Sequence, residues 1–395
     1  MTVLIYYPYF SETVGGGEYI PLSIAKDLQK EHKIILLTRT VFDFERVEKQ
    51  YGIRLLKENI DVHELHPKSN FARFFNVFFR NYETETIKKW AKIADVCISC
   101  HDVVDFGKPG IHFMCLSNFD YEYQRWLTGI PLPHRKLSHR IFRFVFDGIR
   151  NIIYGKNRTP REIFSDPREK IFPNSKFVAK AVASYYGRKD LEVFYPPTLF
   201  RPLPLEINKS GVVYIGRIDW EKRVDAIIEV VERTRKITKT NLILKIAGFI
   251  PDDEYGNKIR EIANERPWVR LLGPVVGDEK RDLLAKSAYA IHGRIYENFG
   301  ISVTEYLKAG IVPIVPDKGG ATEIVACDEL TYGTIDEATA ILSKLVCDES
   351  FRHRMLDYCL ERGDEFSSKK YWARQRDLLA RIIDSNKVYS TIEQQ

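Results

Sequence analysis

The sequence predicts an α/β protein built from two doubly wound domains, each with a parallel sheet covered by helices. A pattern of strand, glycine-rich turn and helix opens the chain and restarts near residue 211, and a proline-rich stretch at 195–204 separates the halves. The 395 residues also exceed the size at which a single core usually stops growing, about 250–300 residues. We therefore expect an N-terminal domain at 1–197, a C-terminal domain at 205–370 and a central cleft between the two facing sheets.

The first half opens with a βαβ unit and continues with two further apolar segments. Its expected elements are strands at 2–7, 33–38, 94–100 and 111–116, and a helix at 19–30. Continuous apolar runs of this length are typical of buried strands in a parallel sheet. Cys97 and Cys100 fall inside one run, so their spacing indicates buried thiols rather than a redox or metal motif.

The second half repeats this alternation after the proline-rich stretch. Expected strands lie at 211–216, 242–247 and 288–292, expected helices at 223–235 and 255–265, and residues 283–286 form part of another helix. Ligands of open α/β sheets bind beyond the carboxyl ends of the strands. We therefore expect the functional residues just after these strands.

The composition is that of a folded protein with a mildly basic surface. Lys plus Arg number 60 and Asp plus Glu 54, an excess that suits phosphate-bearing ligands or an anionic membrane surface. The six cysteines form no dense framework, and the chain shows neither a signal-peptide pattern nor an apolar run of about 20 residues. We expect a cytoplasmic protein without a nucleic-acid partner, with peripheral attachment to the cytosolic membrane face as the alternative.

Two segments that mix aromatic and basic residues, 71–80 and 140–158, leave membrane contact open. Segments of this kind either lie in a bilayer interface or pack as ordinary amphipathic helices on a sheet. The second interpretation is the simpler one, and a lipid acceptor would favour the first.

The segment 296–310 has the composition of an anion-binding helix start. Glu297 precedes and Glu305 follows a helix start at Phe299-Gly300. Backbone N–H groups at 298–301, reinforced by roughly half a positive charge from the helix dipole, would hold a phosphate there. Glu305 is then placed to accept hydrogen bonds from a ribose, and Glu297 from sugar hydroxyls. The alternative is a pair of solvated glutamates on a surface helix.

A second phosphate-binding feature follows the first strand of the second half. Arg217 and Lys222 lie on one turn there, offering a bidentate fork and a point charge to phosphate oxygens. Either residue alone would be an ordinary surface charge. Their position at the carboxyl end of a strand favours a role in binding.

The glycine run at residues 15–17 would let a phosphate or sugar approach the backbone of the first half. It is not a dinucleotide motif, because the third glycine position of that motif is occupied by Ile20, and no Gly-Lys-Ser/Thr follows as in a Walker loop. His112 closes an apolar strand segment, and we expect its side chain to point into the cleft.

Together these features resemble the retaining glycosyltransferases of family 4, which have the GT-B fold of two Rossmann-like domains. In the second half the resemblance rests on Arg217 and Lys222, the segments 245–248 and 272–275, the pair Glu297 and Glu305, and the segment 319–325. In the first half it is weaker, resting on Gly16-Gly17, His112 and the segments 173–177 and 195–197.

The resemblance implies a role for each matching residue. Arg217 and Lys222 would bind the donor pyrophosphate, Glu305 the ribose and Glu297 the donor sugar. The other implied contacts are the backbone of Phe299, Gly300 and Ile301 with phosphate and sugar, Val275 beside the base, Gly16 and Gly17 over the phosphates, and His112 near the reacting carbon.

The resemblance also implies a last helix, beginning near 366–372, that crosses back to the first domain over about 371–395. The family is generally metal-independent, no Asp-x-Asp pair occurs in this sequence, and no cofactor is expected. One departure from the family pattern is Arg294, which lies close to Glu297 in the sequence and leaves the identity of the donor sugar open.

The function implied is transfer of a hexosyl unit, with retention, from a GDP- or UDP-linked sugar to a glycan or polyprenyl-linked acceptor. Mannose is the leading donor sugar, because the features around His112, 174–175 and 195–197 are similar to mannosyltransferases of lipid-linked oligosaccharides. Two alternatives remain: a nucleotide-sugar epimerase of the same fold, and a non-catalytic sugar-nucleotide-binding protein.

Overall fold

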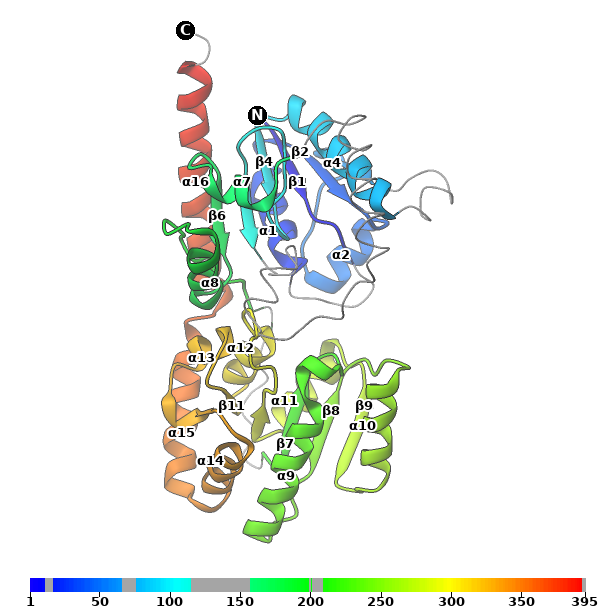
Figure 1. Ribbon diagram of the computed structural model, residues 1–395, viewed down its shortest axis with the longest axis vertical. Coiled ribbons are helices and arrows are strands. Elements are labelled where there is room, and N and C mark those ends of the chain that lie inside the picture. Colours follow the sequence, from blue (N-terminus) through cyan, green and yellow to red (C-terminus); the bar gives the residue numbers. More distant parts are fainter. Residues whose placement is uncertain (11–16, 66–75, 115–156, 199, 201–208, 393–395) are drawn as a thin grey trace, which may run out of the picture. The chain divides into compact units, whose positions relative to one another are not determined.

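The computed structural model describes residues 1–10, 17–65, 76–114, 157–198, 200 and 209–392. The chain divides into two compact units, the first comprising Met1–Pro197 with Tyr371–Gln395 and the second Thr198–Lys370 (Figure 1). Gly16 and most of the aromatic and basic segments 71–80 and 140–158 lie outside the described residues.

The first unit is built on a six-stranded parallel sheet. Its strands are β1 (Thr2–Tyr6), β2 (Lys33–Thr38), β3 (Ile60–Glu64), β4 (Val96–Ser99), β5 (Ile111–Met114) and β6 (Lys170–Pro173). Their order in the sheet is β3-β2-β1-β4-β5-β6, so β1 lies between β2 and β4. The central strands are apolar and almost fully buried, as a sheet covered on both faces requires.

The helices of the first unit begin and end at residues suited to helix ends. They are α1 (Tyr19–Leu28), α2 (Phe44–Tyr51), α4 (Asn76–Ile93), α7 (Pro160–Ser165) and α8 (Lys176–Tyr186). Asp43 and Ser175 cap α2 and α8 by accepting backbone N–H bonds, and Gly52 and Gly187 end these helices in the left-handed conformation.

The C-terminal helix α16 (Ser368–Ile392) contributes to the first unit from Tyr371 onward. The buried side chain of Gln375 accepts a bond from Ser23 at 2.6 Å and donates one to Asp27 at 2.8 Å, which fixes α16 against α1. Leu378, Leu379 and Ile382 are also buried. Polar and apolar contacts therefore both hold this segment on the first unit.

The second unit repeats the strand order of the first. Its strands are β7 (Val212–Ile215), β8 (Leu244–Ala247), β9 (Val269–Gly273), β10 (Tyr289–Ile291), β11 (Val312–Pro316) and β12 (Thr331–Tyr332), in the order β12-β11-β10-β7-β8-β9. All pairings are parallel, and β7 lies between β8 and β10. The loops that follow β7 and β10 therefore leave the same edge of the sheet side by side.

Helices follow nearly every strand of the second unit. They are α9 (Val224–Thr238), α10 (Glu254–Asn264), α11 (Gly277–Ala285), α12 (Ile301–Lys308), α13 (Gly320–Val325), α14 (Ile335–Cys347) and α15 (Glu349–Asp364), with 3-10 turns at Trp220–Lys222 and Asp328–Leu330. The predicted fold class of two parallel α/β sheets is thus confirmed. The structure adds strands β3, β6, β9, β11 and β12, which the sequence pattern did not predict.

Candidate functional site

The turn after β7 carries Arg217 and Lys222. The buried Tyr214 donates its hydroxyl to the Arg217 carbonyl at 2.8 Å, and Asp219 accepts the Lys222 N–H at 3.1 Å. The Arg217 side chain is 73% exposed, and its guanidinium lies 3.7 Å from the Asp219 carboxylate. The turn is therefore fixed by its backbone, while the Arg217 side chain extends into solvent where a ligand can reach it.

Glycines allow this turn to pack directly against the loop after β8. Gly248 has a φ of +155°, and a Cβ there would lie 1.8 Å from the Gly216 carbonyl oxygen. The Ile218 N–H donates to the Phe249 carbonyl at 3.1 Å across the same contact. No larger residue fits at position 248 without displacing the turn that carries Arg217.

Glu297, in the loop between β10 and α12, lies at the centre of a cluster of basic side chains. Its Oε2 lies 2.5 Å from Lys222 Nζ and 3.2 Å from His292 Nε2, the latter outside hydrogen-bond geometry. A guanidinium nitrogen of Arg294 lies 3.8 Å from Oε1 and, on its other side, Arg294 contacts Glu221 at 2.8 Å. The structure thus brings Lys222 and Glu297 together, although 75 residues separate them in the chain.

The electrostatics of this cluster keep Glu297 ionised. Burial acts to raise the pKa of Glu297, but the attraction of Lys222, the largest opposing influence, and of Arg294 outweighs it and places that pKa well below its ordinary value. Burial lowers the pKa of His292, so its imidazole is neutral at pH 7. An ionised carboxylate in such a place is a strong hydrogen-bond acceptor for hydroxyl groups.

The glycine pair Gly319-Gly320 supports the backbone of Glu297. The Gly320 N–H donates to the Glu297 carbonyl at 2.6 Å, and Cβ atoms on Gly319 and Gly320 would lie 2.7 Å from the Ile295 carbonyl oxygen and 2.3 Å from that of Asn298. Gly319 also has a φ of +92°. This close approach explains why the segment at 319–325 opens with two glycines.

Helix α12 begins without a capping side chain among the residues that the structure describes. Gly300 precedes it with a φ of +103°. Phe299 is buried and packs edge-on against Phe366, with ring centroids 6.0 Å apart. The first N–H groups of a helix have no partner within it, so Ile301 and the residue after it present donors and the positive end of the dipole.

Glu305 lies one turn further along α12 and is paired with a lysine that the sequence did not single out. Lys280 of α11 places its ammonium 2.6 Å from Glu305 Oε1, and the Glu305 side chain is 10% exposed. Val275 packs nearby in the core cluster that includes Tyr306, whose hydroxyl accepts the Ile215 N–H at 2.7 Å. Glu305 and Val275 therefore both lie where α11 and α12 meet the end of β7.

His112, predicted to point into the cleft, lies instead in a buried network of the first unit. It is the second residue of β5, not the last, and its side chain is fully buried. Nε2 lies 3.0 Å from Glu169, and Nδ1 accepts the Val104 N–H at 3.3 Å. Glu169 also accepts bonds from Arg158 at 2.5 Å and from the Gly110 N–H at 2.6 Å. Both imidazole nitrogens are thus used in packing the strand.

Gly17 also packs against its own unit. A Cβ on Gly17 would lie 2.9 Å from the Tyr7 hydroxyl, so the missing side chain allows that contact. Its predicted partner Gly16 lies outside the described residues.

Three residues of the site escaped the sequence analysis as ligands or partners: Lys280, His292 and Glu221. His292 follows the last residue of β10, and this strand-end position was the one signal that could have identified it. Lys280 and Glu221 are charged residues among several in their segments, and their partners are fixed only by the packing of separate elements.

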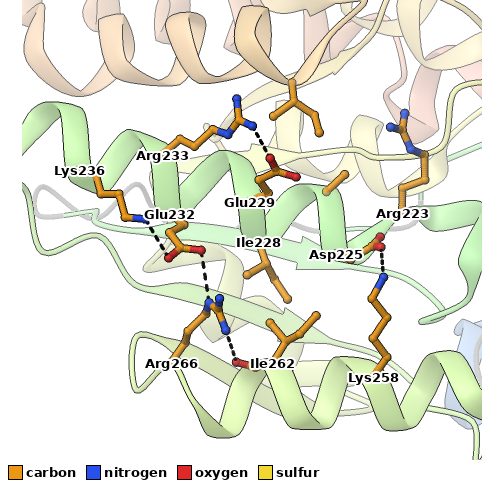
Figure 2. A pocket seen from close by; sticks show the side chains of 12 residues that line it. Arg223, Asp225, Ile228, Glu229, Glu232, Arg233, Lys236, Lys258, Ile262 and Arg266 are labelled. Atoms are coloured by element: carbon orange, nitrogen blue, oxygen red, sulfur yellow. Dashed lines mark hydrogen bonds and ion pairs between the residues drawn. The ribbon is translucent and has the colours of Figure 1, made fainter.

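A concave surface of the second unit, of about 580 Å³, contains none of the predicted site residues (Figure 2). It runs between α9 and α10, where the charged side chains pair with one another. Asp225 lies 2.7 Å from Lys258, and Glu232 lies 3.2 Å from Lys236 and 3.3 Å from Arg266. Dashed lines mark these ion pairs in Figure 2. Each of the three carboxylates that line the groove, Asp225, Glu229 and Glu232, is paired with a basic side chain, as is usual on an exposed surface.

Within the part of the chain that the structure describes, no three or more His, Cys, Asp or Glu side chains are grouped so that they could hold a metal ion. Across the same residues, no helix combines the length and the apolar character needed to cross a membrane.

Comparison with known sequences identifies a matching family and distant relatives of this chain. Residues 197–360 match the family described as "Glycosyl transferases group 1". The GPI3 subunit of phosphatidylinositol N-acetylglucosaminyltransferase from Schizosaccharomyces pombe is 23% identical over 80% of this chain and 66% of its own length. GDP-Man:Man(3)GlcNAc(2)-PP-Dol alpha-1,2-mannosyltransferase of Caenorhabditis elegans is 24% identical over 37% of this chain and 35% of its own. The chain thus aligns with no more than about two thirds of either relative.

Solved structures resemble the whole chain in fold. WaaG, a glycosyltransferase involved in lipopolysaccharide biosynthesis, superposes with a TM-score of 0.66 at 14% identity, covering 96% of this chain and 99% of WaaG. HepE of Anabaena, in complex with UDP and glucose, gives 0.66 at 13% identity, covering 96% and 100%. Two units, each with a six-stranded parallel sheet, are the architecture of the GT-B fold. Residues 197–360 thus match the group 1 glycosyltransferases, and the chain shares the fold of the solved glycosyltransferase structures.

Proposed function

We propose that this protein transfers a hexosyl unit from a nucleotide-diphosphate sugar to an acceptor hydroxyl, with retention at the anomeric carbon. The observation that carries the proposal is the contact between Lys222 and the ionised Glu297 beside the uncapped start of α12. A cation, a helix N-terminus and a hydrogen-bond-accepting carboxylate are what a diphosphate attached to a sugar needs.

In this proposal the diphosphate is bound by Arg217, Lys222 and the backbone N–H groups at Phe299, Gly300 and Ile301. Lys222 exchanges part of its contact with Glu297 for the phosphate oxygens, which leaves Glu297 to accept hydroxyl groups of the sugar. Glu305, held by Lys280, accepts bonds from the ribose, and Val275 lies beside the base. We leave His112 out, because its ring is buried and both nitrogens are bonded.

The chemical step follows from this arrangement. The bond from the anomeric carbon to the diphosphate oxygen breaks, and Lys222, Arg217 and the α12 N-terminus stabilise the charge that develops on the leaving group. The acceptor hydroxyl attacks from the same face, and its proton passes to the departing phosphate oxygen. Fixed positive charge on the protein thus supplies much of the rate enhancement.

Mannose from GDP-mannose is the first donor to test, and UDP-N-acetylglucosamine is the second. The names of the two curated relatives support one each, mannosyl transfer and N-acetylglucosaminyl transfer. The structural relative solved with UDP and glucose supports a UDP-linked donor. For the acceptor we propose a glycan or a lipid-linked glycan, reached from a membrane surface.

A thermal-shift panel of GDP, UDP, ADP and their sugars tests donor binding, because a ligand that binds only the folded state raises the melting temperature. We expect one nucleotide series to stabilise the wild-type protein and to lose this effect in Arg217→Ala. NMR of the product made from the preferred donor then reports the anomeric configuration. An inverted glycoside, or conversion of the donor without any acceptor, would contradict the proposal.

A further inference from the structure

Arg294 lies between two glutamates at the edge of the proposed donor site. One nitrogen of its guanidinium lies 2.8 Å from the Glu221 carboxylate, and the other lies 3.8 Å from Oε1 of Glu297. The first distance is that of a direct ion pair, whereas the second exceeds hydrogen-bond length. Arg294 therefore pairs with Glu221 and lies beside Glu297 without bonding to it.

The backbone that leads into Arg294 is held against the turn after β7. A Cβ on Gly293 would lie 2.2 Å from the Lys222 carbonyl oxygen and 3.3 Å from that of Arg223, so the glycine allows the two loops to touch. Because this backbone is fixed, rotation of the Arg294 side chain has to cover the ~1 Å that separates its guanidinium from hydrogen-bond distance to Glu297. A long, partly exposed arginine side chain can make this movement without any change in the fold.

Titratable side chains from two strand ends surround Glu297. They are Tyr214 and Lys222, from β7 and the turn after it, and His292 and Arg294, from the loop after β10. Burial raises the pKa of Tyr214 and lowers that of His292, so both side chains are neutral at pH 7. Of these four groups, Lys222 at 2.5 Å and Arg294 at 3.8 Å therefore supply the positive charge beside Glu297.

A diphosphate in the proposed site competes with Glu297 for Lys222. The diphosphate oxygens carry more negative charge than one carboxylate, so they draw the ammonium toward themselves. Glu297 is only 9% exposed, and a buried carboxylate whose cation is drawn away either pairs with another cation or takes up a proton. A protonated Glu297 would be a weaker acceptor for the hydroxyl groups of the sugar. The donor complex therefore needs a second cation at this carboxylate.

We propose that Arg294 is a positioning residue that binds Glu297 once the diphosphate has drawn Lys222 toward itself. The guanidinium turns from Glu221 to Oε1 of Glu297 and keeps the carboxylate ionised, which leaves Oε2 to accept a hydroxyl of the donor sugar. The Glu221 side chain is 40% exposed, so water solvates it when Arg294 leaves. This exchange rests on the proposed transferase function, because it needs a diphosphate in the site.

The substitution Arg294→Gln tests the exchange, because it removes the positive charge and leaves a polar side chain. We expect kcat with the preferred donor to fall about 10- to 100-fold, the cost of one misplaced reacting group. The KM for the donor should stay within about threefold of the wild-type value, because Arg217, Lys222 and the α12 N-terminus still bind the diphosphate. Initial rates of nucleotide release measure both constants.

The pH profiles of Arg294→Gln separate the free protein from the donor complex. The acid limb of kcat/KM reports the free protein, and the acid limb of kcat reports the complex. In the free protein Lys222 is the largest influence that lowers the pKa of Glu297, so the limb of kcat/KM should move little. In the complex of the variant, burial raises this pKa without a second cation to oppose it, so the limb of kcat should move to higher pH.

Three further variants show whether the charge at position 294 is the cause. Arg294→Lys keeps the charge and Glu221→Gln leaves Arg294 charged, so both should keep the wild-type acid limb of kcat. The matched control is Arg266→Gln, because Arg266 also lies between two glutamates, Glu232 at 3.3 Å and Glu265 at 3.2 Å. Its side chain is 26% exposed, against 19% for Arg294, and lies in the groove between α9 and α10. This control should keep the wild-type kcat and both acid limbs.

Thermal shift with UDP and GDP keeps the two proposals apart. The nucleotide that stabilises the wild-type protein should stabilise Arg294→Gln equally, which also shows that the variant is folded. If neither nucleotide stabilises the wild type and it transfers no sugar, the transferase proposal itself fails. The role of Arg294 alone would be overturned by a wild-type acid limb of kcat in Arg294→Gln, by the same shifted limb in Glu221→Gln, or by lost nucleotide stabilisation in Arg294→Gln.

Discussion

Each sheet carries a buried histidine next to a buried glutamate, and the two pairs lie at opposite edges. In the first unit His112 Nε2 is 3.0 Å from Glu169, which immediately precedes β6. In the second unit His292 Nε2 is 3.2 Å from Glu297, and His292 immediately follows β10. The chemical groups and the distances are nearly the same in the two pairs. The pairs differ in the edge of the sheet at which each one lies.

The partners of each glutamate differ accordingly. Glu169 is satisfied by Arg158, by the Gly110 N–H and by His112, all from its own unit and none placed beyond the carboxyl ends of the strands. Glu297 faces Lys222, which extends from a turn beside the open start of α12. A carboxylate at the amino edge stabilises the fold, and one at the carboxyl edge is available to a ligand. Four predictions test this division.

The largest effect is expected from Glu297→Gln. The amide keeps the shape but loses the charge that accepts sugar hydroxyls and balances Lys222, so we expect the transfer rate to fall about 10²–10³-fold, the cost of one preorganised electrostatic contact. Initial rates of nucleotide release from the preferred donor give the measurement. Glu229→Gln, on α9 in the ion-paired groove and 43% exposed, is the matched control and should retain the wild-type rate. A fall of less than tenfold in Glu297→Gln would place the chemistry elsewhere.

We expect Glu169→Gln to have the opposite effect: it should lower the stability of the protein and leave donor binding intact. It leaves Arg158 without its closest partner in a site where Glu169 is fully buried, and removing one member of a buried pair costs about 3–5 kcal/mol. Urea unfolding followed by circular dichroism measures this loss. Glu192→Gln, which breaks an ion pair with Arg381 in the same unit where both side chains are 53% exposed, is the control and should cost far less. Lost donor binding in folded Glu169→Gln would contradict the division between the two edges.

The pH dependence of Lys222→Met sharpens the assignment of Glu297. Burial raises the pKa of Glu297 and Lys222 is the largest influence that lowers it, so the wild-type carboxylate remains ionised well below its ordinary range. Its contribution is therefore present at neutral pH and is lost only when acid reaches the lowered value. Without Lys222 the pKa of Glu297 rises, and the acid limb of kcat/KM should move to higher pH.

Arg217→Gln is the control for this profile. Arg217 is mostly exposed and is not among the groups that shift the pKa of Glu297. Its replacement should lower the rate through weaker diphosphate binding without moving the acid limb. If both variants show the same limb as the wild type, then Glu297 does not carry the pH dependence.

The fold was predictable because the apolar runs that become β1, β2, β7 and β8 are local features of the sequence. The position of Glu297 just before a helix was predictable for a similar reason, since Phe299-Gly300 marks the helix start. His112 was misplaced because its orientation depends on its distance from the strand end, and β5 continues to Met114. A run of apolar residues does not show where the strand stops.

The ion pairs made by Lys280 and Glu83 could not be predicted. Lys280 meets Glu305 only because α11 and α12 pack together, and Glu83 meets Arg39 only because α4 lies beside the end of β2. Nothing in the local sequence distinguishes either residue from the other charged residues of its helix. Long-range ion pairs of this kind are a property of packing rather than of pattern.

The smallest effect is expected in the groove between α9 and α10. Arg233 contacts Glu229 and Asp336, each at 2.5 Å, but its side chain is 43% exposed and that of Asp336 86%. Exposed ion pairs are screened and lose side-chain entropy, so Arg233→Ala should change the free energy of unfolding by about 0.5 kcal/mol or less and leave the transfer rate unchanged. Urea unfolding and the nucleotide-release assay measure both quantities. A large loss of activity would mean that this groove, rather than the edge carrying Lys222 and Glu297, binds a ligand, because charges that only neutralise one another at the surface have no other way to affect the reaction.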